Sequence, residues 1–354
     1  MNASSARAAA NPAGDAGKPQ EKRALLPNGY VTMETTIPTL SAAFVPGAVW
    51  RDTDGAPIQA HGGGILRAND TFYWYGENKN APNNRRADGT PAERVDVIGV
   101  SCYSSRDLRR WKNEGVVLAA RPDDPAHDLH PSQVFERPKV IHCPATGKFV
   151  LWAHVDSPDY KKASVGVAVA DEPTGPFAYR GSFQPNRGES RDMTVFVDPA
   201  SPDMAYLLYS SEGNETLHIT PLTPDFLSVD ERAPVSRAFV GESREAPAAW
   251  FHEGRYYLIT SGCTGWRPNP ARWHVADSLL GEWVTMGDPC VGDADGTTFN
   301  AQSTFVLPVG DEFVFLADRW NRHNLQDSRY VWLPLRMANG VPHIEWHDTW
   351  QLRL

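Results

Sequence analysis

Five times along the chain, a polar residue precedes an apolar, strand-like segment, and an aromatic-rich segment follows after a turn. The aromatic-rich segments have the length and composition of buried β-strands. They are TFYWYGE (71–77), KFVLWAH (148–154), MAYLLYS (204–210), RYYLITS (255–261) and EFVFLAD (312–318). A third strand-like segment and often a fourth come next in each case. The repeating unit is therefore predicted to be a meander of antiparallel strands.

The spacing of the repeats predicts their number and arrangement. The polar residues that precede the five units are His61, Glu136, Asp192, Glu245 and Gln302, and they are separated by 75, 56, 53 and 57 residues. Propeller blades of the kelch type recur at about 50 residues, so the pattern predicts an all-β fold, a five-bladed β-propeller. The longer first interval contains a polar insertion, 78–96, which we place in a loop at the rim.

The propeller is expected to span residues 29–354 as a single domain, because the repeats leave no room for another. Residues 1–28 are rich in alanine, asparagine and charged residues and have no periodic pattern, so we expect a flexible N-terminal arm there. They lack the continuous apolar segment of a signal peptide, which leaves the cellular compartment open.

A propeller brings the starts of its innermost strands together at one mouth of the central channel. The five polar residues should therefore meet there, and three of them are acidic. The alternative is that they are ordinary polar residues capping a solvated channel. Clustered carboxylates repel one another and raise a pKa, which is how a general acid is commonly prepared.

Composition limits the classes of ligand that the protein is expected to bind. The formal net charge is −9, and no cluster of Lys and Arg is visible, so we expect neither a nucleic-acid nor a membrane partner. Twelve Trp, 11 Tyr and 14 Phe offer surfaces suited to sugars, so an oligosaccharide or polysaccharide is the expected partner of a monomer. The four cysteines show no metal-ligand spacing, and we expect mostly buried thiols, no metal ligands and no required cofactor.

The order of several short motifs resembles glycoside hydrolase family 43, and within it the exo-β-1,3-galactanase group, over about residues 45–352. The motifs are HGGGI, ERPKV, SRDMTVFVD, EAPA, SGCTGW, QSTFVLP, ADRW and SRYVWLPL. The resemblance implies a five-bladed propeller and hydrolysis with inversion of anomeric configuration. It also implies that Glu245 of EAPA is the general acid and that Asp192 of SRDMT adjusts its pKa.

One position departs from the wider family, in which the first blade carries an Asp as general base. Here that position reads QAHGGG, without Asp, as in the galactanase group. The resemblance makes Gln302 of QST the proposed base, placed close to the attacking water. The alternative is that Gln302 only binds substrate and that Glu136 of ERPK activates the water. Inversion requires roughly 6.5–9.5 Å between the acid and the base.

Further residues match sugar-binding positions of the group. They are Glu77, Tyr160, Asn214, Thr264 and Trp266, and Trp320 of ADRW is a candidate stacking platform. For the aromatic residues, packing between blades is an equally good interpretation. His61 is grouped with these contacts, with two alternatives: it holds a water or a structural ion in the central channel, or it marks tight packing of the glycine-rich backbone.

Three functions are consistent with the sequence. The first is an inverting exo-β-1,3-galactanase that releases galactose from β-1,3-galactan, the backbone of arabinogalactan. The second is an α-L-arabinofuranosidase or another furanosidase on the same scaffold. The third is a carbohydrate-binding propeller without activity, against which the retained Glu245 and Asp192 argue.

Overall fold

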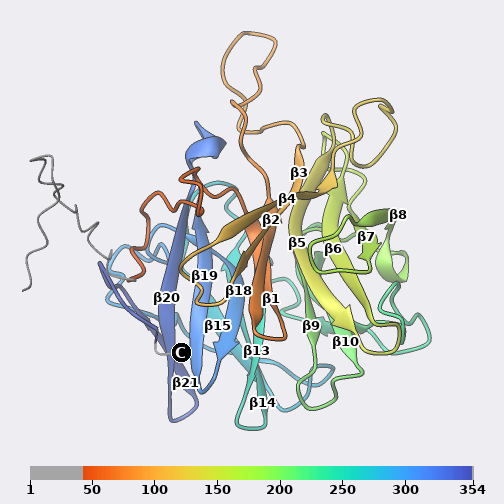
Figure 1. Ribbon diagram of the computed structural model, residues 1–354. Coiled ribbons are helices and arrows are strands. Elements are labelled where there is room, and N and C mark those ends of the chain that lie inside the picture. Colours follow the sequence, from red (N-terminus) through yellow and green to blue (C-terminus); the bar gives the residue numbers. More distant parts are fainter. Residues whose placement is uncertain (1–42, 353–354) are drawn as a thin grey trace, which may run out of the picture. The chain divides into compact units, whose positions relative to one another are not determined.

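The computed structural model describes residues 43–352, which fold into five antiparallel sheets arranged around a central axis (Figure 1). Blade 1 contains β1 (His61–Ala68), β2 (Thr71–Glu77), β3 (Gly99–Ser105) and β4 (Lys112–Ala119). Blade 2 contains β5 (Val134–Cys143), β6 (Lys148–Asp156), β7 (Ser164–Ala170) and β8 (Ala178–Phe183). Blade 3 contains β9 (Met193–Val197), β10 (Ala205–Ser211), β11 (Thr216–Pro221) and β12 (Ser236–Ala238).

The remaining two blades complete the ring. Blade 4 contains β13 (Arg244–His252), β14 (Arg255–Gly262), β15 (Arg272–Ala276) and β16 (Val284–Thr285). Blade 5 contains β18 (Gln302–Val309), β19 (Glu312–Arg319), β20 (Arg329–Ala338) and β21 (Val341–Glu345), and β17 (Cys290–Val291) adds to its outer edge, parallel to β21. The predicted five-bladed propeller is confirmed. The described residues contain only two helices, both short 3₁₀ turns, η1 (Pro185–Arg187) and η2 (Leu325–Asp327).

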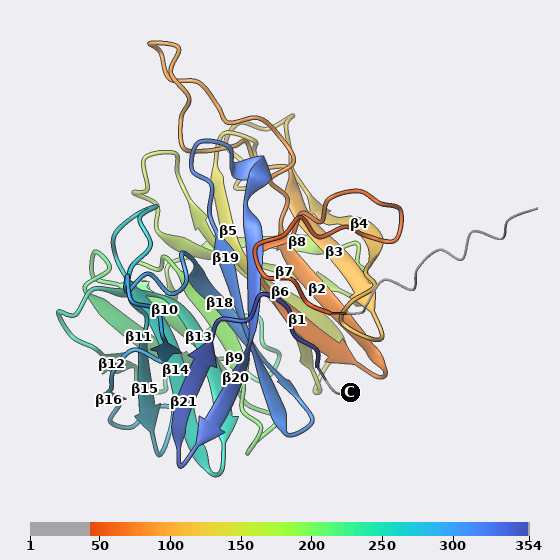
Figure 2. The same cartoon turned by 90° about the vertical axis from the view of Figure 1, so that its left-hand side faces the viewer.

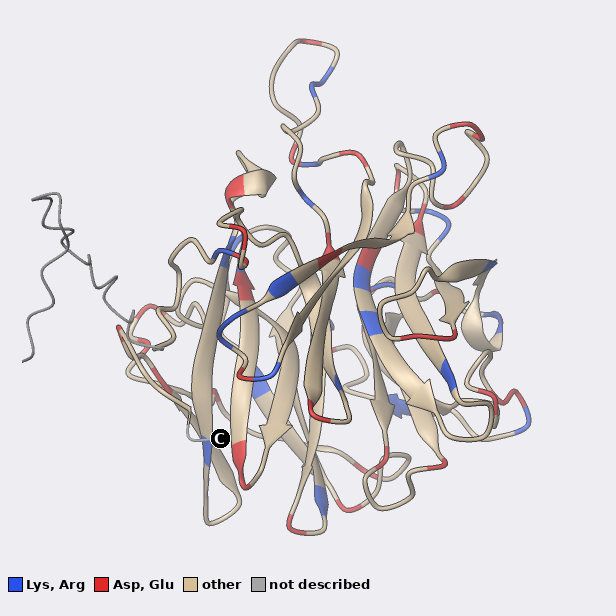
Figure 3. Ribbon diagram, in the orientation of Figure 1, with Lys and Arg blue, Asp and Glu red and all other residues tan. Residues whose placement is uncertain are grey.

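The middle strands of the blades are buried on both faces because each sheet packs against its two neighbours. All seven residues of β7 and all seven of β10 are buried. This explains why the corresponding sequence segments read as nearly continuous apolar runs. Figure 3 shows the complementary pattern, with most charged residues in the loops at the ends of the blades.

The innermost strands share a feature at their starts that periodicity does not reveal. The pairing with the second strand shifts register after His61, Glu136, Glu245 and Ser303, in blades 1, 2, 4 and 5. In three of these bulges the next residue is left-handed: Gly62 (φ 60°), Arg137 (φ 55°) and Ala246 (φ 53°). A bulge re-aims the adjacent side chains, which is why such irregularities gather near active sites.

An aromatic cluster joins the first blade to the last. Trp74 of β2 lies edge-on to Tyr330 of β20, with 4.6 Å between the ring centroids, and 4.7 Å from Trp332. Phe44 exchanges two backbone hydrogen bonds with Trp350 and stacks on its ring. Blades 1 and 5 share no strand, so this cluster is a principal contact that closes the ring.

The loop predicted at 78–96 lies between the end of β2 and the start of β3, and it extends away from the sheets in both views (Figures 1 and 2). Three cysteines are buried as expected, whereas Cys263 is exposed. The predicted arm, 1–28, lies outside the described residues. Within 43–352, no helix is long and apolar enough to cross a membrane.

The aromatic cluster generates a stability prediction. Trp332→Ala removes a fully buried ring at the junction of blades 1 and 5, so the free energy of unfolding should fall by about 3–5 kcal/mol. Denaturant unfolding measures this change. The control is Val240→Ala, a truncation at a side chain that is 59% exposed, which should change stability by less than about 0.5 kcal/mol. Equal effects of the two changes would contradict the role given to the cluster.

Candidate active site

A cavity of about 300 Å³ lies where the innermost strands of the blades begin. It receives side chains from all five blades. We call it the catalytic cavity, and its lining residues are Glu77, Lys79, Glu136, Arg137, His154, Tyr160, Arg191, Asp192, Asn214, Glu245, Gly265, Trp266, Gln302 and Trp320. Nine of the residues singled out from the sequence are therefore brought together: Glu77, Glu136, Tyr160, Asp192, Asn214, Glu245, Trp266, Gln302 and Trp320.

Arg137 is the centre of the polar network. Its guanidinium pairs with Asp192 through two nitrogens, Nε to Oδ1 at 3.2 Å and Nη2 to Oδ2 at 2.9 Å. It also donates to the side-chain carbonyl of Gln302 (2.5 Å) and to the backbone carbonyl of Ser303 (2.9 Å). The backbone amide of Arg137 donates to Glu77 Oε1 (3.1 Å). The side chain of Arg137 thus links blades 2, 3 and 5, and its backbone amide adds blade 1.

Glu245 has the properties of a general acid. Burial raises the pKa of its carboxyl to about 7, and the charge of Asp192 contributes to the increase, while Arg137 opposes it. Asp192 is held beside Glu245 by the Ala246 amide, which donates to Asp192 Oδ2 (3.1 Å). A carboxyl that keeps its proton near neutral pH can donate it to a leaving group.

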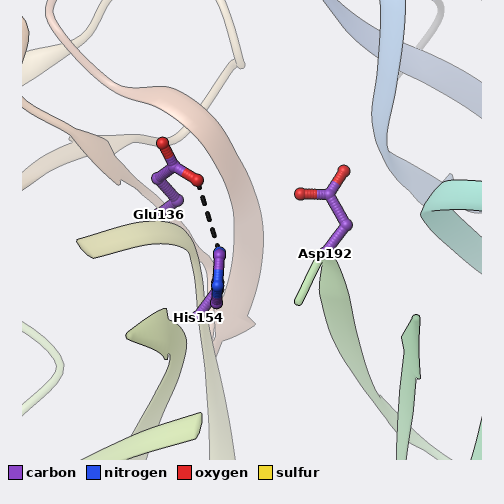
Figure 4. A group of neighbouring side chains, drawn as sticks. All are labelled: Glu136, His154 and Asp192. Atoms are coloured by element: carbon purple, nitrogen blue, oxygen red, sulfur yellow. Dashed lines mark ion pairs between the residues drawn. The ribbon is translucent and has the colours of Figure 1, made fainter. Parts of the chain in front are cut away.

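Glu136 has the opposite electrostatic environment. Burial opposes its ionisation, but the hydrogen bond and the charge of His154 outweigh burial and lower the pKa of Glu136 to about 2. Figure 4 shows His154 aimed at Glu136, with 3.3 Å between Nδ1 and Oε2, and Asp192 facing them. On its other side His154 lies 3.1 Å from Asp156, and these two carboxylates raise the pKa of His154 to about 9 against the effect of burial. Glu136 is therefore ionised at every working pH.

Glu136, His154 and Asp192 have ligand atoms within 4.8 Å of one another, a spacing that could hold a metal ion. Their charges are already compensated by protein groups, because His154 is held between two carboxylates and Asp192 is paired with Arg137. A cation here would have to displace Arg137 and take the proton from His154. The donor set therefore fits a charge network better than a metal site.

The Gln302 amide makes every hydrogen bond that its side chain can make. Its Nε2 donates to Glu245 Oε1 and to Ser261 Oγ, both at 3.0 Å. Its Oε1 accepts from Arg137 and, at 3.2 Å, from Trp320 Nε1. Direct contact with Glu245 is far below the acid–base separation of roughly 6.5–9.5 Å that inversion requires. The expectation that these two residues form the separated pair is wrong for this geometry.

Aromatic residues form the walls. Trp266 and Trp320 meet edge to face, with 5.7 Å between the ring centroids. Tyr160, 42% exposed, donates its hydroxyl to Glu136 Oε1 (3.0 Å). Unlike the rings of the aromatic cluster between blades 1 and 5, the side chains of Trp266, Trp320 and Tyr160 line the cavity. Their interpretation as substrate contacts is therefore favoured over packing between blades.

Two predicted contacts do not reach the cavity. His61 is fully buried, with Nδ1 3.0 Å from Asp318 and its ring stacked on Tyr330. It helps to join blades 1 and 5, so its assignment to substrate binding is wrong. Thr264 is also outside the lining, because its hydroxyl donates to the carbonyl of Arg267 and accepts from Asn269 within the loop. The next two residues, Gly265 and Trp266, line the cavity instead.

Four charged lining residues were not predicted: Lys79, Arg137, His154 and Arg191. Lys79 comes from the insertion and pairs with Glu77 (2.6 Å). Arg137 stands directly after Glu136 in ERPK, and a strand pattern would point it to the opposite face of the sheet. Only the bulge brings both side chains to one cavity. His154, which ends the KFVLWAH segment, pairs with Glu136 across the sheet and could have been found from that register.

Glycoside hydrolases use one protonated carboxyl and one ionised carboxylate, and the catalytic cavity contains both between aromatic walls. The family model of glycosyl hydrolases family 43 matches residues 59–306. The chain belongs to this family. Its five-bladed fold agrees with that membership.

Solved structures give more specific similarities. A family 43 β-1,3-galactosidase with galactodeoxynojirimycin is 39% identical, with 87% of this chain and 100% of that chain covered and a TM-score of 0.80. An exo-β-1,3-galactanase from Phanerochaete chrysosporium with β-1,3-galactotriose is 38% identical over 88% of this chain and 68% of that chain (TM-score 0.80). An exo-β-1,3-galactanase from Clostridium thermocellum is 34% identical over 87% and 66% (TM-score 0.76). No curated protein matches the chain.

The electrostatics of Glu245 predict the alkaline side of the pH profile. If Glu245 must be protonated, kcat/KM should fall as the pH rises through about 7. Asp192→Asn removes a neighbouring negative charge and leaves Arg137 unneutralised, and both effects lower the pKa of Glu245. The alkaline limb should therefore move to lower pH by at least about one pH unit. Asp203→Asn, at an exposed turn, is the control. An unmoved limb would show that Asp192 does not set the pKa of the acid.

Proposed function

We propose that this protein is an inverting, exo-acting β-1,3-galactosidase that removes galactose from the end of β-1,3-galactan chains. The observation that carries the proposal is the 39% identity to a β-1,3-galactosidase that is covered over its whole length. The structures with galactotriose and with galactodeoxynojirimycin support galactose as the sugar that the cavity receives. A furanosidase remains the second reading from the sequence, and no contact in the cavity favours it.

Glu245 supplies the proton on the leaving-group side. Its carboxyl protonates the glycosidic oxygen as the bond to the anomeric carbon breaks. The charge of Asp192 helps to keep the proton on Glu245 until substrate binds, and the ion pair with Arg137 holds Asp192 in place beside it.

Glu136 is a better candidate than Gln302 for the base that activates the attacking water. A carboxylate is a stronger base than an amide, even when His154 lowers its pKa to about 2. The side-chain carbonyl of Gln302 already accepts from Arg137 and Trp320, so it would have to release one of them before it could accept from a water. We propose that Glu136 takes the proton of the attacking water and that Gln302 orients the acid.

The substrate class is tested by incubating the protein with β-1,3-galactan, arabinogalactan and a panel of aryl glycosides and identifying the released sugar. Release of galactose from β-1,3-galactan, one unit at a time, is the expected result. Release of arabinose alone would support the furanosidase. Binding without release of any sugar would support the carbohydrate-binding propeller.

A leaving-group comparison tests the acid. Glu245→Gln keeps the shape of the side chain but removes the proton, so turnover of a galactan oligosaccharide should fall by roughly 10²- to 10⁴-fold. An aryl galactoside with a good leaving group needs little protonation and should lose much less. Measurement of kcat on both substrates decides, because equal losses would mean that Glu245 is not the acid.

Azide distinguishes the two candidates on the water side. Glu136→Ala should lose turnover on every substrate, and azide should restore part of it by replacing the water, giving a glycosyl azide of inverted configuration. Gln302→Ala should behave as an acid-side variant, with a larger loss on poor leaving groups and no rescue. Rescue of Gln302→Ala, together with unrescued loss in Glu136→Ala, would instead assign the water to Gln302.

A further inference from the structure

Lys139 is a buried cation hydrogen-bonded to Arg137 of the catalytic cavity, and the reaction described above does not use it. It lies on β5, is 2% exposed and does not line the catalytic cavity. Its ammonium donates to two backbone carbonyls, that of Gly62 at 2.7 Å and that of Arg137 at 3.3 Å. An ammonium held by carbonyls instead of a carboxylate is costly to bury.

The two acceptors are the left-handed residues that follow the strand starts in blades 1 and 2. The amide of Gly62 donates to Asp318 (2.7 Å), and the amide of Arg137 donates to Glu77. Lys139 is therefore a single donor that holds both bulges in place. The bulge at Arg137 directs the guanidinium to Asp192 and Gln302, so its geometry sets the position of the groups around Glu245.

Burial of the Lys139 ammonium is energetically unfavourable, and its pKa reflects this. Burial and the charge of Arg137 together lower the pKa of its ammonium to about 7, against the attraction of Asp192, Glu77 and Asp318. An apolar side chain of similar length would fill the same space without this cost. The amine is instead used for two hydrogen bonds to backbone carbonyls, which an apolar side chain could not make.

The side chain of Lys139 lines a second cavity, at the opposite end of the innermost strands. A largely apolar cavity of about 470 Å³ lies between the innermost strands, and its lining includes Lys139, Gly64, Phe196, Phe251 and Phe305. The Lys139 stem passes Gly64 so closely that a Cβ there would lie 2.8 Å from Lys139 Cδ. A small amine could occupy the space of the lysine stem from this cavity.

We propose that Lys139 is a positioning residue for the hydrolysis: it fixes the peptides of Gly62 and Arg137 and thereby holds Arg137, Asp192 and Gln302 in the arrangement that the acid requires. The proposal rests on the proposed glycosidase activity. It does not depend on which sugar is released, because any glycoside that the native protein hydrolyses can report on it.

The test is amine rescue of Lys139→Ala in the full-length protein. The variant should lose roughly 10²-fold in kcat with little change in KM, as expected when catalytic groups are misplaced. n-Propylamine replaces the missing part of the side chain and should restore at least a tenth of the native kcat. Tetramethylammonium, a cation without an N–H donor, should not. Lys148→Ala, at the exposed first residue of β6, is the matched control and should retain native activity.

Two results would overturn the proposal: native kcat in Lys139→Ala, or a folded but inactive variant that n-propylamine does not restore. If Lys139→Ala fails to fold, Lys139→Met provides the test, because its stem keeps the packing against Gly64 while the donor is lost. A folded Met variant with reduced kcat and unchanged KM supports the proposal, and one with native kcat contradicts it. If no glycoside is hydrolysed by the native protein, the proposed function itself has failed.

Discussion

The site depends on one partly buried ion pair, between Arg137 and Asp192. A guanidinium and a carboxylate removed from water are stable only when each finds further partners, and loss of either leaves the other as an uncompensated charge. The guanidinium of Arg137 meets this condition through the two acceptors on blade 5, Ser303 and Gln302, and Asp192 meets it through the Ala246 amide. This ion pair therefore stabilises the centre of the ring. It also fixes Asp192 beside Glu245, where the charge of Asp192 helps to raise the pKa of the acid.

This arrangement requires strained backbone conformations. Arg137 and Ala246 adopt left-handed conformations that side-chain-bearing residues rarely take, each at a cost of order 1 kcal/mol or more. The bulges direct side chains from different blades into one cavity. There Glu245 and Glu136 have opposite protonation states. Glu245 keeps its proton near neutral pH because it is buried beside Asp192, whereas Glu136 stays ionised because His154 is charged.

The repeat of polar residue and apolar strand was sufficient to predict the five blades and the meeting of Glu136, Asp192, Glu245 and Gln302, because propeller symmetry converts sequence register into proximity. The partners of these residues could not be predicted in the same way. Arg137 reaches the cavity only because of a bulge, and the contact of Gln302 with Glu245 depends on side-chain orientation. His61 followed the repeat correctly, but Asp318 and Tyr330 bury it at the junction of blades 1 and 5.

The most direct test of the account is the anomeric configuration of the sugar first released. Proton NMR of β-1,3-galactotriose during hydrolysis distinguishes the two anomers before they equilibrate. If Glu245 protonates the leaving group and a water activated by Glu136 attacks from the opposite face, the first product is α-galactose. Initial appearance of β-galactose would show retention through a covalent intermediate and would contradict the assignment of acid and base.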